Sequence, residues 1–122
     1  MMIVVTNNEN VQAIVPSVDW VEGTPLDVIT RVETLLQQGY RLVTSPLSAN
    51  NRLNRSPYRS VIMSSTSTWN GDDLALLQRA RSLIERQGMV SDKSAEADYR
   101  WLDAELTRVA WGQSSYGDME NK

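Results

Sequence analysis

The sequence contains no cysteine and no histidine. Without cysteine, disulfides, thiol catalysis and cysteine-ligated zinc are excluded. Without histidine, a Ser-His-Asp triad and an imidazole general base are excluded as well. Carboxylates, Lys, Tyr and Ser remain for chemistry, together with a metal borrowed from outside the chain. We therefore expect no resident cofactor or metal, and we expect a binding protein more than an enzyme.

A surplus of positive charge is also lacking. Twelve Lys and Arg stand against 15 Asp and Glu, so the formal net charge is −3. Nucleic acids and anionic membranes are bound through surplus positive charge, so neither is an expected partner. No apolar run is long enough to span a membrane. The first residues lack the basic start and long apolar stretch of a signal peptide, which predicts a cytoplasmic protein.

The residues that are present have the balance of one ordinary globular domain. The chain has 122 residues, of which 41% are hydrophobic and 22% are charged. This length suits a single hydrophobic core. We assign residues 1–112 to one α/β domain and residues 113–122 to a polar, frayed C-terminal tail.

Short apolar runs predict the strands of a sheet. The run over residues 2–6 is continuous and rich in β-branched side chains, which is typical of a strand buried on both faces. Further short runs occupy residues 11–15, 18–21, 40–44 and 58–64. We interpret these five runs as strands, and for residues 18–21 an extended connection is the alternative.

One helix has clear start and stop signals. Thr24 can cap it, Pro25 suits the first position, and Asp27 completes a capping box. Apolar residues then recur at helical spacing until Gly39, a residue type that often follows the last turn.

Two further helices are predicted later in the chain. One begins at an Asn70 cap and ends at Gly88. The other runs from about residue 94 to residue 111, with an apolar stripe formed by Tyr99, Leu102, Leu106 and Val109. The order of elements predicts an α/β fold, a small mixed or parallel sheet of about four to five strands covered by about three helices.

Charge is segregated along the chain in a way that predicts a binding surface. Residues 34–71 contain four arginines and no Asp or Glu. Arginine forks suit phosphate and carboxylate oxygens, and strand-end loops of α/β sheets often form the ligand crevice. The alternatives are an ordinary solvated loop whose arginines pair with acids of the last helix, and a simple asparagine turn. The candidate ligand-binding residues are Thr6, Asn7, Asn8, Ser45, Ser48, Asn51, Arg52, Arg55, Tyr58 and Arg59.

The other polar and aromatic residues suggest structural roles. Asp72 and Asp73 suit the start of a helix. The carboxylates of the last helix, among them Asp103, are expected on a solvated face. Trp101 lies off the apolar stripe of that helix and Trp111 near its end, so we expect one of them to be buried in a homodimer.

Three segments carry a family resemblance. They are residues 3–8 (Ile-Val-Val-Thr-Asn-Asn), residues 39–48 (Gly-Tyr-Arg-Leu-Val-Thr-Ser-Pro-Leu-Ser) and residues 56–62 (Ser-Pro-Tyr-Arg-Ser-Val-Ile). All three resemble segments of the small GrdX family. The resemblance covers residues 1–85 and implies a gene neighbourhood with glycine, sarcosine or betaine reductase, but no activity. A histidine often precedes the Pro-Leu-Ser unit in that family, and Ser45 stands there here. A chain without cysteine cannot itself be a redox-active reductase subunit.

Together these observations favour a GrdX-like accessory or binding protein that holds a small anion or a protein partner at the strand-end loops. An enzyme that uses the same crevice with a borrowed metal or a substrate base is one alternative. A structural homodimer subunit is the other.

Overall fold

The computed structural model describes residues 2–47, 55–65, 72–88 and 93–120, and the side chains of 93–94 and 114–120 are not described. The predicted cap Asn70 and loop residues 48–54 lie outside these ranges. Among the described residues, no helix combines the length and the apolar character that crossing a membrane requires.

The sheet is mixed and contains four strands, as the α/β prediction allowed. Its order is β2-β1-β4-β3, with β1 parallel to β2 and β4 antiparallel to both of its neighbours. The carboxyl end of β1 therefore lies beside the amino end of β4, where Thr6 pairs with Ser60. The strands span Met2–Thr6 (β1), Val18–Trp20 (β2), Arg41–Leu42 (β3) and Ser60–Ser64 (β4).

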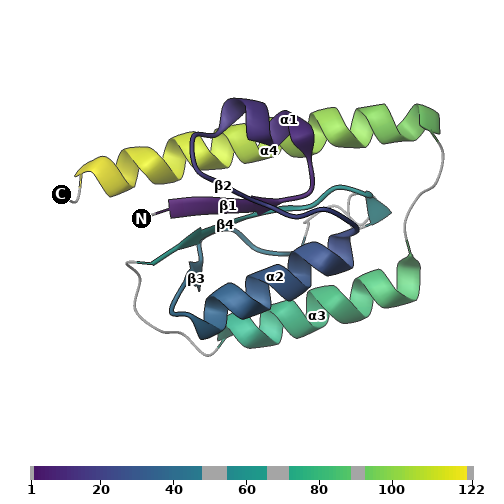
Figure 1. Cartoon of the computed structure of the whole chain (residues 1–122), viewed down its shortest axis with the longest axis horizontal. Helices are drawn as coiled ribbons and strands as arrows, with labels where there is room; N and C mark the ends of the chain where they lie inside the picture. The colour runs from purple at the N-terminus through teal and green to yellow at the C-terminus, as the bar shows by residue number, and fades with distance from the viewer. Residues whose placement is uncertain (1, 48–54, 66–71, 89–92, 121–122) are drawn as a thin grey trace.

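Helices cover both faces of the sheet, giving three layers (Figure 1). On one face, α2 and α3 pack over strand residues such as Val5 and Met63. On the other face, α1 and α4 pack over Val4 and Ile62. Neighbouring strand residues thus belong to opposite cores, as strand geometry requires. The helices span Glu9–Ile14 (α1), Pro25–Gln37 (α2), Asp72–Gln87 (α3) and Lys93–Glu120 (α4).

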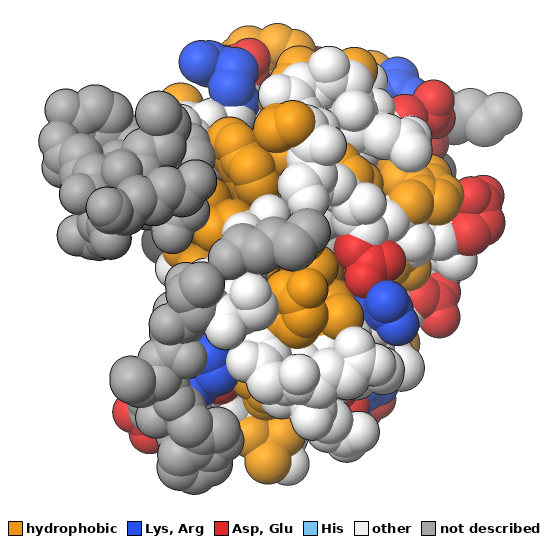
Figure 2. All heavy atoms as spheres, turned by 60° about the vertical axis from the view of Figure 1, so that its left-hand side comes forward, with side chains coloured by type: hydrophobic (Ala, Val, Ile, Leu, Met, Phe, Trp, Pro, Cys, Tyr) orange, Lys and Arg blue, Asp and Glu red, His pale blue; other side chains and the backbone are white. Residues whose placement is uncertain are grey.

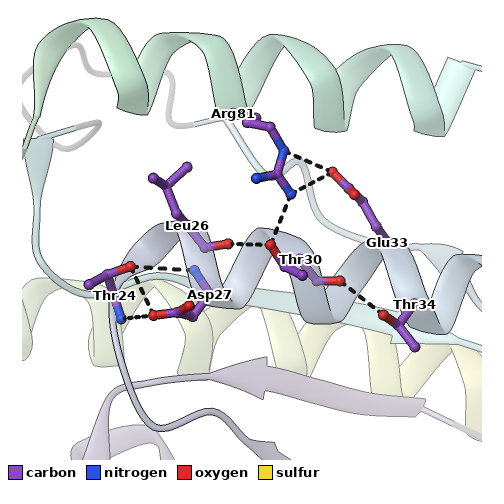
Figure 3. Close-up of polar contacts among 7 residues, drawn as sticks. All are labelled: Thr24, Leu26, Asp27, Thr30, Glu33, Thr34 and Arg81. Atoms are coloured by element: carbon purple, nitrogen blue, oxygen red, sulfur yellow. Dashed lines mark hydrogen bonds and ion pairs between the residues drawn. The ribbon is translucent and has the colours of Figure 1, made fainter.

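Helix α2 confirms its predicted start (Figure 3). Thr24 accepts a hydrogen bond from the backbone of Asp27, and the Asp27 carboxylate accepts one from the backbone of Thr24. Gly39 follows the helix with φ of 101°, a backbone conformation that favours glycine. Across the layer, Arg81 of α3 donates to Thr30 and Glu33 of α2.

The prediction of a strand-like run at residues 11–15 is wrong, because this segment forms α1. Asn8 caps the helix by accepting a hydrogen bond from the backbone nitrogen of Asn10. Val11 and Val15 lie four positions apart and are both buried in the core between α1 and the sheet. That spacing places them on one face of a helix turn. The described residues therefore contain four helices, one more than the predicted three, and the additional helix is this short one.

Other elements differ from their expected lengths. Strand β3 comprises only two of the five residues predicted, and β4 begins at Ser60 rather than at Tyr58. Helix α4 continues to Glu120, beyond the predicted end at Trp111. The division into a domain over 1–112 and a tail over 113–122 stays a prediction.

Half of the apolar stripe predicted for α4 is exposed, whereas Tyr99 and Leu102 are half-buried. Leu106 and Val109 are 53% and 46% exposed, whereas Ala104 and Thr107 are buried. The reason lies in the sheet beneath α4, whose surface at the end of β1 is polar and is better matched by hydrogen-bonding side chains.

Candidate functional site

A cavity of about 260 Å³ lies between α4, the segment that follows β3 and the segment around the start of β4. One wall is the face of α4 that carries Tyr99, Asp103 and Leu106. The remainder of the wall comes from residues 44–47 and from residues in the range 56–62. Backbone nitrogens of Val43 and Thr44 donate to the carbonyl of Ile62, which fixes these segments side by side.

Asp103 is the central polar group of this cavity. Its Oδ2 accepts a hydrogen bond from Asn8 Nδ2 at 2.9 Å and another from Ser60 Oγ at 2.7 Å. Ser60 Oγ also lies 2.7 Å from Thr6 Oγ1, so a chain of hydrogen bonds runs from β1 to α4. Burial raises the pKa of Asp103, while the two hydrogen bonds and the charge of Arg59 oppose that rise.

Arg59 supplies the positive charge of the cavity wall. Its side chain is buried, and Nη1 donates to the carbonyl of Pro46 at 2.6 Å. Burial lowers the pKa of the guanidinium, and the negative charge of Asp103 opposes this effect. The two side chains thus present opposite charges to the same small space.

Asn7 holds the backbone at Arg59 and does not line the cavity. Its Nδ2 donates to the carbonyls of Gly23 and Pro57, and its Oδ1 accepts from the backbone nitrogen of Arg59. All three bonds are 2.9 Å long. Because the amide has made its bonds within the fold, we assign Asn7 a positioning role rather than ligand contact.

The predicted site residues fall into three groups. The structure brings Thr6, Asn7 and Asn8 together with Tyr58 and Arg59, and it places Ser45, Tyr58 and Arg59 in the cavity wall. Arg55 is exposed and does not line the cavity. Ser48, Asn51 and Arg52 lie outside the described residues. The predicted clustering of arginines is therefore represented, in the described part of the wall, by Arg59.

The comparison with known families covers nearly the whole fold. The model of the GrdX-like protein family matches residues 3–111. This chain belongs to the GrdX-like family. The match extends past residue 85, where the resemblance of the sequence segments ended, and includes the part of α4 that forms the cavity wall. No curated protein and no solved structure matches the chain.

The segments that carried the GrdX resemblance converge on the cavity. Residues 3–8 include Thr6 and Asn8, whose side chains hydrogen-bond to Ser60 and Asp103. Residues 39–48 and 56–62 supply much of the wall. Ser45 also lines the cavity, and its Oγ accepts a hydrogen bond from the backbone of Leu47.

The sequence pattern predicts a solvated face for Asp103. In the structure its carboxylate instead accepts hydrogen bonds from Asn8 and Ser60, and burial raises its pKa. A usable signal existed in its spacing. Tyr99, Asp103 and Thr107 lie four positions apart, so they share one side of the helix.

The rest of the GrdX-like cavity wall is apolar. Leu47, Ile62, Leu106 and Ala110 contribute hydrocarbon surface opposite or beside the charged pair. Tyr58 lies at the boundary, where its hydroxyl donates to Glu96 at 2.9 Å and its pKa is raised, chiefly by burial. Such a mixture of apolar wall and few placed polar groups is typical of small-molecule sites.

Proposed function

We propose that this GrdX-like protein is a non-catalytic accessory protein that binds a small organic ligand carrying an anionic group. The observation that carries the proposal is the cavity whose wall combines the Arg59 guanidinium with the Asp103 carboxyl group and apolar side chains. Drug-sized ligands occupy sites of roughly 300–1,000 Å³. A cavity of about 260 Å³ therefore suits a ligand of small-metabolite size.

The position of Arg59 favours an organic anion over a large polyanion. A single guanidinium enclosed by protein can meet one carboxylate or phosphate group. On the face of the molecule that Figure 2 shows, the described Lys and Arg side chains lie apart from one another and form no continuous basic patch. Binding of nucleic acid would need many phosphate contacts at once.

A thermal-shift screen against small carboxylates, phosphates and amino acids tests this function. A compound at 100 times its dissociation constant should stabilise the protein by roughly 2.7 kcal/mol. Leu106→Trp places a larger side chain at the cavity wall and should abolish the shift. Val109→Trp is the matched control, because Val109 lies on the same helix but does not line the cavity. Absence of any shift, or equal shifts in both variants, would contradict the proposal.

Catalysis in the same cavity is a second candidate, and Asp103 is the observation that favours it. A carboxyl group with a raised pKa in a cavity has the property of many general acids and bases. The described wall contains no other carboxylate, and no group of three or more acids that could hold a metal occurs among the described residues. Incubation of each bound compound with protein, followed by mass spectrometry, distinguishes turnover from binding.

Self-association is a separate candidate that Trp101 favours. Its side chain is 61% exposed, whereas Trp111 packs against the core between α4 and the sheet. Large aromatic side chains often anchor interfaces. We therefore propose that a homodimer would form around Trp101, and that Trp101→Gln would shift it to monomer. Light scattering that finds a monomer of the unchanged protein at high micromolar concentration would contradict this idea.

A further inference from the structure

We propose that the ligand of the cavity is a small zwitterion, whose ammonium group meets Asp103 and whose carboxylate lies toward Arg59. This inference rests on the proposed binding function and names the class of ligand. The juxtaposition of one carboxyl and one guanidinium in a single small cavity carries it.

One oxygen of the Asp103 carboxyl group, Oδ1, has no hydrogen-bond partner among the described residues. Among the described residues, Asn8 and Ser60 hydrogen-bond to the Asp103 carboxyl group, and both bonds end on Oδ2. Every fully buried side-chain nitrogen or oxygen of the described residues has a partner. No described donor reaches Oδ1, so this oxygen is not fully buried, and it belongs to a residue that lines the cavity. A carboxylate oxygen accepts hydrogen bonds, so the group that meets it must be a donor.

The donor that meets Asp103 is expected to carry a positive charge. Burial disfavours a negative charge at Asp103, and a positively charged donor compensates such a charge better than a neutral one does. An ammonium group supplies both the hydrogen bond and the charge. Among the described contacts, no hydrogen bond or ion pair joins Arg59 to Asp103, and Nη1 of Arg59 donates to the carbonyl of Pro46.

The cavity wall contains one group of each charge, the Asp103 carboxylate and the Arg59 guanidinium. A ligand with only an ammonium group would gain at Asp103 and be repelled by Arg59. A ligand with only a carboxylate would gain at Arg59 and be repelled by Asp103. A molecule that carries both groups gains at both positions. Its hydrocarbon part can lie against Leu47, Leu106 and Ala110.

Four compounds with the same six-carbon chain separate these possibilities. Norleucine and 6-aminohexanoate are zwitterions with near and distant charges, hexanoate has only the carboxylate, and hexylamine has only the ammonium group. In calorimetric titrations of the full chain, we expect one zwitterion to bind at least about tenfold more tightly than hexanoate and hexylamine. A tenfold change corresponds to about 1.4 kcal/mol.

Two variants assign the effect to Asp103. Asp103→Asn keeps the shape of the side chain and should weaken the preferred zwitterion at least tenfold while leaving hexanoate equal or tighter. Asp98→Asn removes the same charge from an exposed position of α4 and should change neither affinity. Thermal melts of both variants show whether each remains folded. Because Asp103→Asn could still disturb the hydrogen bonds with Asn8, Asp103→Glu serves as a second variant and should retain the preference for a zwitterion.

The outcomes divide cleanly. Binding of hexanoate or hexylamine as tightly as both zwitterions would overturn the inference, and so would zwitterion binding that Asp103→Asn leaves unchanged. Failure of both zwitterions to bind overturns it as well. In that last case the proposed binding function still stands if other compounds give thermal shifts that Leu106→Trp abolishes and Val109→Trp retains. If no compound does so, both proposals fail.

Discussion

The side-chain amide of Asn8 donates to the carboxylate of Asp103 over 2.9 Å, although 95 positions separate the two residues. The same nitrogen donates to the carbonyl of Arg100, and the oxygen of the Asn8 side chain caps α1. Asn8 is fully buried. One side chain thus joins the turn after β1, the start of α1 and the middle of α4, and it orients the carboxyl group of the candidate site.

Asn8→Ala should lower the free energy of unfolding by about 2–4 kcal/mol. The loss of a helix cap costs about 1 kcal/mol, and a buried acceptor that loses its donor adds about 1–3 kcal/mol. Urea denaturation measures the change. Asn10→Ala is the matched control, because Asn10 is exposed and only its backbone meets Asn8. Similar stability of both variants would mean that the Asn8 contacts contribute little.

Asp103 should make the folded protein less stable as the pH rises. Its pKa in the folded state is raised by burial above the ordinary value of about 3.9 that holds in the unfolded chain. Between these two pKa values the folded state binds more protons, so the free energy of unfolding falls with increasing pH. Asp103→Asn removes this dependence and should therefore be more stable, relative to the unchanged protein, at pH 7 than near pH 4.

The comparison is made by urea denaturation of both proteins at each pH. Taking the difference between the two proteins cancels the titration of other acids, such as Asp27, whose pKa is lowered by its hydrogen bonds with Thr24. A difference that does not change between pH 4 and pH 7 would show that the enclosure of Asp103 does not perturb its ionisation.

Local signals explain what could be predicted from the sequence. Thr24, Asp27 and Gly39 mark the ends of α2 through contacts within a few residues, so the boundaries of this helix could be predicted. The continuous apolar run over residues 2–6 likewise indicates a strand covered on both faces, and β1 is one. The family resemblance pointed to the segments that border the cavity, but not to the cavity itself.

Long-range contacts explain what could not be predicted. The hydrophobic pattern of α4 alone places Leu106 and Val109 inside, because it contains no information about the surface below the helix. That surface carries Thr6 and Ser60, which meet only because β1 pairs antiparallel with β4. Strand order is a property of the assembled sheet, and the polar environment of Asp103 follows from it. The short α1 was missed because its two buried valines match a strand run as well as a helix turn.

Thr24→Ala should destabilise the protein by about 1 kcal/mol, since the capping box loses the oxygen that accepts the backbone hydrogen of Asp27. Thr34→Ala tests the same change of residue type inside α2, where the hydroxyl only bonds back to the carbonyl of Thr30 (Figure 3). That variant should be neutral or slightly more stable, because alanine is the better helix former. Thermal denaturation of the pair checks both expectations, and equal losses would indicate that the cap contributes nothing of its own.

Asp73→Ala should be strongly destabilising, with an expected loss of about 3–5 kcal/mol, because breaking a buried ion pair leaves a charge in a poorly solvated place. The Arg41 and Asp73 side chains are only 4% and 10% exposed. Both Nε and Nη2 of Arg41 donate to Asp73 Oδ2, at 2.9 and 2.6 Å, and the backbone nitrogen of Leu42 donates to the same oxygen at 3.1 Å.

These three bonds fasten the first turn of α3 to β3, the two-residue strand at the edge of the sheet. Asp72→Ala is the control, since Asp72 is the exposed neighbour in the same helix turn and shares its favourable interaction with the helix dipole. That interaction contributes about 0.3–1 kcal/mol, so the control should lose no more than this.

Because residues 43–47 run directly from β3 into the cavity wall, Asp73→Ala should also weaken ligand binding, whereas Asp72→Ala should not. Urea denaturation measures the loss of stability, and titration with a compound found in the thermal-shift screen measures the loss of binding. A loss of stability below about 1 kcal/mol for Asp73→Ala would show that the edge of the sheet is held by other contacts.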